Sequence, residues 1–221
     1  MKAILFDLDN TLYPPERELF SLIDQRINRY MCDVVGIPVA DVDGLRRRYW
    51  ADYGVTLGGL IRHWGVDPED YLEYVHDVDV AGRLSADLGL RQMLQALPVR
   101  RAVFTNGSRG HADRVLGVLG LQGVFEEIFD IRVASYLPKP HEAPYRKVLE
   151  HLSLAGENCL MVEDSAANLA TAKELGMGTI LVGAGQAPAF VDVQIPQLSL
   201  LPQALATWWP AAAGAATPWV K

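Results

Sequence analysis

The chain has 221 residues, of which 50% are hydrophobic and 21% are charged, a composition that suits a globular protein with one α/β core and an insertion. Its formal net charge of -7 offers no basic field for a polyphosphate backbone, so a nucleic-acid polymer is not expected as a partner. No apolar run has the length of a signal-peptide core or a membrane span. We therefore expect a cytoplasmic protein that binds small molecules and no membrane.

The chain opens with a short apolar run, residues 3–6, that ends abruptly at Asp7. Such a run predicts a strand that is buried on both faces, as in a parallel sheet. From about residue 14 the pattern becomes helical only, with apolar residues at Leu19, Leu22 and Ile23, and no run predicts a strand before about residue 82. The sequence thus predicts a helical insertion, residues 14–85, with hinges at Pro14-Pro15 and near 82–89.

Strand and helix alternate after this insertion. Apolar runs predict strands at residues 102–104, 128–134, 159–162 and 179–182, with a weaker candidate at 193–198. The alternation predicts a doubly wound, mainly parallel α/β sheet in a core of residues 1–13 and 86–206, with residues 14–85 as an α-helical cap domain. After about Pro202 the chain turns to Ala, Pro and Trp, so we expect no regular element there and treat 207–221 as a C-terminal tail.

Polar residues follow three of the predicted strands. Asp7 and Asp9 follow the first, and the others are Thr105 with Asn106 and Glu163 with Asp164. Because the carboxyl ends of parallel strands share one edge of the sheet, we expect these side chains to meet there. Carboxylates about 4 Å apart repel by roughly 4 kcal/mol at a surface-like dielectric, so a cation must offset them.

The expected cation is Mg²⁺, because the available ligands are hard oxygens and no histidine or cysteine cluster competes. Lys139, between two prolines in YLPKP, supplies a second positive charge. The five histidines show no metal-ligand spacing and are interpreted as surface or structural polar residues. The basic run Arg46 to Arg48 is interpreted as the solvated face of a cap helix, with contact to an anionic substrate as the alternative.

Four segments in this order resemble the motifs of the haloacid dehalogenase (HAD) superfamily. They are DLDNT at 7–11, TNGS at 105–108, Lys139, and EDSAAN at 163–168. Each alone has a structural explanation, such as a turn at 105–107 followed by a helix N-cap at Ser108. Their order along the whole core favours the resemblance.

The resemblance implies a Mg²⁺-dependent phosphatase that acts on a small phosphorylated metabolite through an aspartyl phosphate. Asp9 favours phosphate esters over halides, since a departing halide needs no proton. The resemblance implies that Asp7 is the nucleophile, that Asp9 is the general acid and base, and that Lys139 neutralises Asp7 and the phosphate. The implied metal ligands are Asp7, the Asp9 backbone carbonyl, Asp164 and Glu163, the last directly or through water. Thr105 and the Asn106 backbone are implied to hold phosphoryl oxygens, and Asn168 to orient groups such as Lys139.

A narrower resemblance concerns the cap, where YWADYGVTLGGL at residues 49–60 is similar to a segment of pyrimidine 5′-nucleotidase-type phosphatases. It implies UMP or CMP as substrate, with Tyr53, Thr56 and Leu57 in the substrate-facing wall of the cap. The alternatives are a HAD phosphomutase, a sugar-phosphate or phosphoglycolate phosphatase, and a binding protein that keeps the fold without its chemistry.

Overall fold

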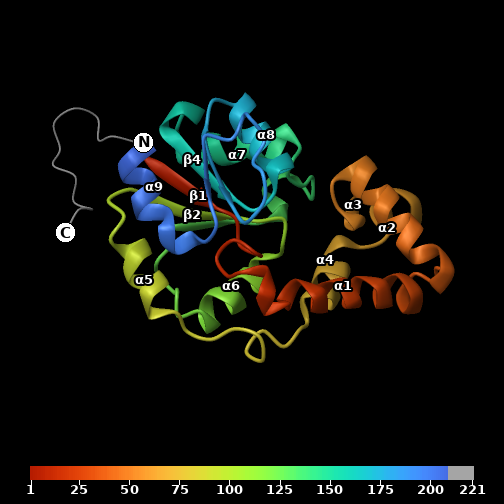
Figure 1. The fold of residues 1–221 in the computed structure, drawn as a ribbon. Helices are drawn as coiled ribbons and strands as arrows, with labels where there is room; N and C mark the ends of the chain where they lie inside the picture. The colour runs from red at the N-terminus through yellow and green to blue at the C-terminus, as the bar shows by residue number, and fades with distance from the viewer. Residues whose placement is uncertain (209–221) are drawn as a thin grey trace.

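The computed structural model describes residues 1–208, which form a parallel sheet with helices on both faces and a helical cap next to one end of it (Figure 1). The six strands are β1 (Ala3–Phe6), β2 (Arg100–Phe104), β3 (Glu127–Phe129), β4 (Cys159–Glu163), β5 (Gly178–Val182) and β6 (Val193–Ile195). Their order is β3-β2-β1-β4-β5-β6, and each neighbouring pair is parallel. The order reverses between β1 and β4, which makes the crevice at their carboxyl ends the expected ligand site.

Helices cover both faces of the sheet, as the doubly wound prediction requires. One face carries α5 (Leu88–Gln95), α6 (Arg109–Val118) and α9 (Leu201–Trp208), and the other carries α7 (Glu142–Leu152) and α8 (Ala166–Glu174). In β1, Ile4 and Phe6 belong to the first core, and Ala3 and Leu5 belong to the second. Successive side chains of a strand point to opposite faces, so a doubly covered strand must be apolar throughout.

Two predicted strands are shorter than expected. The strand predicted at 128–134 ends at Phe129, and Ile131–Ala134 forms a 3-10 helix. The Asp130 carboxylate accepts the backbone N–H of Arg132 at 3.1 Å, which turns the chain where the apolar pattern predicted extension. The strand predicted at 193–198 ends at Ile195, because Pro196 has no N–H to donate to a ladder.

The prediction of no regular element after Pro202 is wrong. Helix α9 runs from Leu201 to Trp208, past the predicted end of the core at residue 206, and buries Leu201, Ala204 and Leu205 against the sheet. These positions have helical spacing, and proline is tolerated in a first turn. The remaining part of the predicted tail lies outside the described residues. None of the helices in the described part combines the length and hydropathy that a bilayer crossing requires.

The inserted segment is helical, as predicted. A 3-10 turn (Pro15–Arg17) precedes α1 (Leu19–Arg29), α2 (Val39–Tyr53), α3 (Thr56–Trp64) and α4 (Pro68–His76), and a π-helical turn (Tyr30–Val34) extends α1. These helices enclose an apolar cluster of their own. Among the described residues, Ile131 is the one buried member of this cluster that comes from the core. The residue limits of the cap domain stay a prediction.

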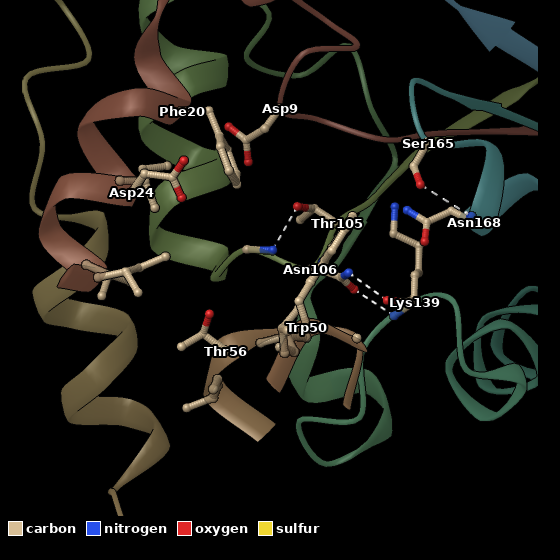
Figure 2. Close-up of a pocket in the computed structure, with 18 of the residues that line it drawn as sticks. Asp9, Phe20, Asp24, Trp50, Thr56, Thr105, Asn106, Lys139, Ser165 and Asn168 are labelled. Atoms are coloured by element: carbon tan, nitrogen blue, oxygen red, sulfur yellow. Dashed lines mark hydrogen bonds between the residues drawn. The ribbon is translucent and has the colours of Figure 1, made fainter. Parts of the chain in front are cut away.

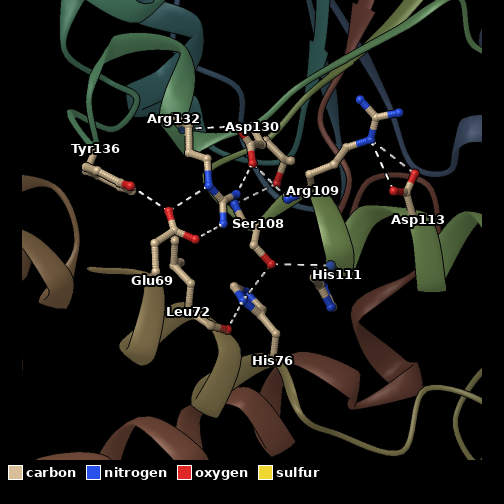
Figure 3. A network of polar contacts seen from close by, with 12 residues as sticks. Glu69, Leu72, His76, Ser108, Arg109, His111, Asp113, Asp130, Arg132 and Tyr136 are labelled. Atoms are coloured by element: carbon tan, nitrogen blue, oxygen red, sulfur yellow. Dashed lines mark hydrogen bonds and ion pairs between the residues drawn. The ribbon is translucent and has the colours of Figure 1, made fainter. Parts of the chain in front are cut away.

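Helix α4 carries polar contacts between the cap and the core (Figure 3). In its first turn, Glu69 accepts from Arg132 Nε at 2.8 Å and Nη2 at 2.5 Å, and from the Tyr136 hydroxyl at 2.5 Å. At its other end, Arg114 Nη2 donates to the backbone carbonyl of His76 at 2.8 Å. Both ends of α4 are thereby attached to the core.

Candidate active site

Three of the four acidic residues predicted to meet do meet at the switch point of the sheet. Asp7 follows β1, and Glu163 and Asp164 stand at the end of β4, its neighbour. One carboxylate oxygen of each of the three lies within 4.8 Å of the others. Asp7 and Glu163 are buried, whereas Asp164 is exposed.

Lys139 joins this cluster from the loop before α7. Its ammonium nitrogen donates to Asp7 Oδ1 at 2.8 Å, to Glu163 Oε2 at 2.8 Å and to the backbone carbonyl of Phe104 at 2.7 Å. All three ammonium hydrogens therefore have acceptors, although the side chain is fully buried. Such complete pairing is what makes a buried lysine tolerable.

Burial and mutual charge set the pKa values in this cluster. Burial raises the pKa of Asp7 to about 7 and that of Glu163 to about 7, against the opposing attraction of Lys139. Burial alone would lower the pKa of the Lys139 ammonium, but the charges of Asp7 and Glu163 outweigh it and raise the pKa. One cation shared by these acids leaves the cluster net negative.

Thr105 and Asn106 follow β2 at the same edge. Thr105 is buried and its hydroxyl accepts the backbone N–H of Gly107 at 2.9 Å. The Asn106 side chain forms a reciprocal pair with the Lys139 backbone, donating to its carbonyl at 2.9 Å and accepting its N–H at 2.8 Å (Figure 2). Asn106 thus holds the Lys139 loop, a role that sequence reasoning did not assign. Ser108 is the N-cap of α6, as the structural explanation of this segment predicted.

Glu163 is more fully engaged than its predicted role as a metal ligand suggests. Its Oε1 accepts the backbone N–H groups of Asp164 and Ser165, both at 3.1 Å, and its Oε2 accepts from Lys139 and from Asn168 Nδ2 at 3.1 Å. Asn168 was expected to orient Lys139. Its side chain instead donates to Glu163, so any effect on Lys139 passes through that carboxylate.

Asp9 lies beside residues that sequence reasoning missed. Its Oδ1 accepts from the Tyr13 hydroxyl at 2.5 Å and contacts His111 Nε2 at 2.8 Å. Burial raises the pKa of Asp9, but attraction to His111 and hydrogen bonds from His111 and Tyr13 outweigh burial and lower the pKa. The interpretation of all five histidines as surface or satisfied residues is wrong for His111, whose buried Nδ1 has no partner within the described residues. A lone histidine in a helix gave no signal of this contact.

The cap and the sheet edge enclose a cavity of about 920 Å³. Asp7, Asp9, Thr105, Asn106, Lys139, Glu163, Asp164 and Asn168 line it from the core. Of the cap residues predicted to face substrate, Thr56 and Leu57 line the cavity, and Tyr53 is not among its lining residues. The Tyr53 hydroxyl instead bonds His63 Nε2 at 2.8 Å on the exposed side of the cap.

Other cap residues take the place predicted for Tyr53. Phe20 and Trp50 line the cavity although they are 41% and 70% exposed, respectively. Arg46 and Arg47 line it as well, which favours the substrate-contact alternative over a purely solvated face. Arg46 is paired with Asp24 and Asn28. Arg47 is exposed, and no ion pair or side-chain hydrogen bond is formed by it among residues 1–208.

The donor set of the cluster fits Mg²⁺. The candidate ligands are carboxylate oxygens close enough to share one ion, and neither nitrogen nor sulfur donors that would favour zinc belong to the group. A divalent cation would also compensate the negative charge that Lys139 alone leaves.

Comparisons with known proteins agree with this geometry. Residues 1–176 match the family model of haloacid dehalogenase-like hydrolases. The chain is 25% identical over 197 residues to phosphate metabolism protein 8 of Saccharomyces cerevisiae, spanning 81% of this chain and 61% of that protein's length. It is 30% identical over 205 residues to phosphoglycolate phosphatase of Rhodospirillum rubrum, covering 83% of this chain and 80% of that protein.

Solved structures share the fold. A HAD phosphatase from Thermococcus onnurineus superposes with a TM-score of 0.62 at 20% identity, covering 93% of this chain and 98% of that one. Haloacid dehalogenases superpose as well, so the fold does not distinguish the two reactions. The motifs, the site and the family match together define the class: the chain belongs to the haloacid dehalogenase-like hydrolase family.

The buried pairing of Lys139 leads to a stability prediction. Lys139→Met keeps the length of the side chain and removes the charge, which leaves Asp7 and Glu163 buried without a cation. We expect the free energy of unfolding in urea with EDTA to fall by roughly 3 kcal/mol. In the control Lys147→Met, which removes an exposed pair with Glu150, the change should stay within about 0.5 kcal/mol. Equal stability of the two variants would contradict the pairing.

Proposed function

We propose that this protein is a Mg²⁺-dependent phosphomonoester hydrolase that forms an aspartyl phosphate on Asp7, with pyrimidine nucleoside 5′-monophosphates such as UMP or CMP as substrates. The observation that carries the reaction type is the Asp7 carboxylate at the floor of a cavity, held by Lys139 at 2.8 Å, with Asp164 and Asp9 lining the same cavity. Its membership of a hydrolase family and a 30% identical phosphatase support this assignment.

In the first step, a carboxylate oxygen of Asp7 attacks the phosphorus atom. The bond between phosphorus and the ester oxygen breaks, and Asp9 gives a proton to the departing alkoxide, which requires Asp9 to be protonated at this step although His111 and Tyr13 lower its pKa. Lys139 binds Oδ1 of Asp7, so it fixes the orientation of the nucleophile and offsets negative charge as the phosphoryl group arrives. The products of this step are the free alcohol and phosphorylated Asp7.

In the second step, Asp9 is the carboxylate and therefore acts as the base. It takes a proton from a water molecule, whose oxygen attacks the phosphorus of the acyl phosphate and releases inorganic phosphate. Asp7 returns as a carboxylate and Asp9 is again protonated. The hydroxyl of Thr105 and backbone N–H groups after β2 are proposed to hold the phosphoryl oxygens in both steps.

Asp7, Asp164 and the backbone carbonyl of Asp9 would hold the metal. Since Glu163 already accepts four hydrogen bonds, we assign it an indirect role through water. Bound Mg²⁺ would supply charge neutralisation for the phosphoryl oxygens. Asn168 would keep Glu163 in the orientation that both Lys139 and the metal require.

The cavity supports a substrate larger than a two-carbon acid. Its volume of about 920 Å³ leaves space for an organic group beyond the phosphate. Phe20 and Trp50 offer exposed aromatic faces there, which suit stacking on a planar base. Thr56 and Leu57 are proposed to complete this wall. Tyr53, bonded to His63, is assigned no direct contact.

A second candidate substrate is phosphoglycolate, which the similarity to the R. rubrum phosphatase favours. The unpaired guanidinium of Arg47 at the cavity offers a partner for a second anionic group. The two candidates differ in what the cap must recognise, a base or a carboxylate.

Replacement of the nucleophile tests the reaction type. Asp7→Asn removes the attacking oxygen anion but keeps the size of the side chain, so phosphate release should fall by at least about 10⁴-fold. Its far-ultraviolet circular dichroism should match that of the wild type. Turnover that persists in a well-folded Asp7→Asn protein would exclude the aspartyl-phosphate mechanism.

Metal removal tests the cofactor. EDTA should abolish phosphate release and Mg²⁺ should restore it, and Mg²⁺ should raise the thermal unfolding midpoint, because a ligand that binds only the folded state stabilises it. In Asp164→Asn, which loses an exposed candidate ligand, we expect a higher Mg²⁺ requirement in both measurements. Activity and midpoint that are indifferent to EDTA would contradict a metal-dependent site.

A phosphate-release screen tests the substrate class. With Mg²⁺ present, kcat/KM for UMP and CMP should exceed that for phosphoglycolate and glucose 6-phosphate by at least about tenfold, which corresponds to roughly 1.4 kcal/mol. Trp50→Ala should reduce this preference through loss of base stacking. A preference for phosphoglycolate that depends on Arg47 would replace the nucleotide assignment with the second candidate.

A further inference from the structure

Two buried histidines lie next to Asp9 and take no part in the chemistry described above. His111 comes from α6 of the core and is 0% exposed, and His76 is the last residue of α4 in the cap and is 5% exposed. Their rings stack, with centroids 4.6 Å apart and planes inclined by 21°. The stack therefore joins the cap to the helix that approaches Asp9.

The orientation of the His76 ring is determined by its hydrogen bonds (Figure 3). Nδ1 lies 2.8 Å from the backbone carbonyl of Leu72 and 3.1 Å from Ser108 Oγ. A carbonyl can only accept, so Nδ1 carries the proton and Ser108 Oγ accepts a share of it. Burial, followed by repulsion from His111, lowers the pKa of His76 to about 3. The His76 ring is thus neutral, has a fixed orientation and stacks on the His111 ring.

The His111 ring is oriented toward Asp9. A carboxylate can only accept, so Nε2 of His111 donates to Asp9 Oδ1 at 2.8 Å, and the Tyr13 hydroxyl donates to the same oxygen at 2.5 Å. Oδ2 of Asp9 has no protein hydrogen bond within residues 1–208. Two donors therefore bind one carboxylate oxygen and leave the other available for proton transfer.

The other nitrogen of His111 argues against a purely structural side chain. Nδ1 is buried and has no hydrogen-bond partner in the described part of the chain. A buried polar atom without a partner lowers the stability of the fold, a cost that an apolar ring of the same shape would avoid. The contact to Asp9 is the one polar interaction that the His111 side chain makes among these residues.

We propose that His111 is a positioning residue for Asp9: its Nε2–H fixes one oxygen of the Asp9 carboxyl so that the other faces the ester oxygen, and the His76 ring on the cap supports His111 in this orientation. The inference rests on the proposed function, in which Asp9 transfers the proton. Loss of the His111 donor should therefore lower kcat most for substrates whose leaving group needs a proton from Asp9.

The experiment compares His111→Phe, which keeps an aromatic ring but removes the donor, with His111→Gln, whose amide N–H replaces Nε2–H. For a nucleoside or sugar monophosphate, whose alkoxide needs a proton to depart, kcat of His111→Phe should fall about 100-fold. For p-nitrophenyl phosphate, whose phenolate departs without one, the fall should stay below about fivefold. On the same nucleoside or sugar monophosphate, kcat of His111→Gln should be at least about tenfold higher than that of His111→Phe. His151→Phe, at an exposed site beside Phe129, is the matched control.

A double-mutant comparison separates positioning from packing. In the Asp9→Asn background, His111→Phe should cause no further fall in kcat, since the group that it positions is already lost. Equal losses on both substrates, or a second full loss on top of Asp9→Asn, would overturn the proposal. So would an unchanged or raised kcat in His111→Phe.

A crystal structure of His111→Phe tests the positioning role of His111 independently of the proposed function. We expect the Asp9 carboxyl to leave its present rotamer in this variant and to keep it in His111→Gln. An unchanged Asp9 in His111→Phe would overturn the positioning role. A wild-type protein that hydrolyses no phosphomonoester would instead overturn the proposed function, and the Asp9 rotamers would still decide the role of His111.

Discussion

The buried ammonium of Lys139 is the interaction on which the rest of the site depends. Its three hydrogen bonds reach the ends of β1, β2 and β4, so these strands must end at the same level for the pairing to exist. The register of the sheet meets this condition, because Phe6 is aligned with both Val103 and Val162. Loss of one acceptor of this buried cation would be costly, so the charge that binds Asp7 also specifies how the strand ends meet.

The cap lines the cavity from the side opposite the sheet edge. It has its own apolar cluster, so its helices do not rely on the sheet for burial. Its polar attachments at Glu69 and His76 bind it to the core, and the His76 ring stacks on His111, which contacts Asp9. In the function that we propose, the core would supply the reacting groups and the cap the surface that a substrate's organic group would meet.

Most of the fold was predictable because β1, β4 and β5 are buried along their whole length and β2 is buried over its last three residues, so each strand contains an apolar run. The prediction failed where short-range polar contacts override that pattern: Asp130 accepts a backbone N–H and ends β3 early, and Pro196 follows β6. It also missed α9, because Leu201, Ala204 and Leu205 form too short a stripe to stand out beside Ala and Pro. The π-helical turn at Tyr30–Val34 and the exact cap contacts have no pattern in the sequence.

The sequence by itself determined that Asp7, Glu163 and Asp164 lie together, since acids after buried strands must share one edge of a parallel sheet whatever the details of packing. Only the tertiary structure decided how their neighbours serve them. Asn106 holds the Lys139 loop, Trp50 takes the place expected for Tyr53 at the cavity, and His111 meets Asp9 across 102 positions of sequence. These partners come from loops and helices far apart in the sequence, and their contacts depend on how those elements pack around the site, which strand-end motifs do not specify.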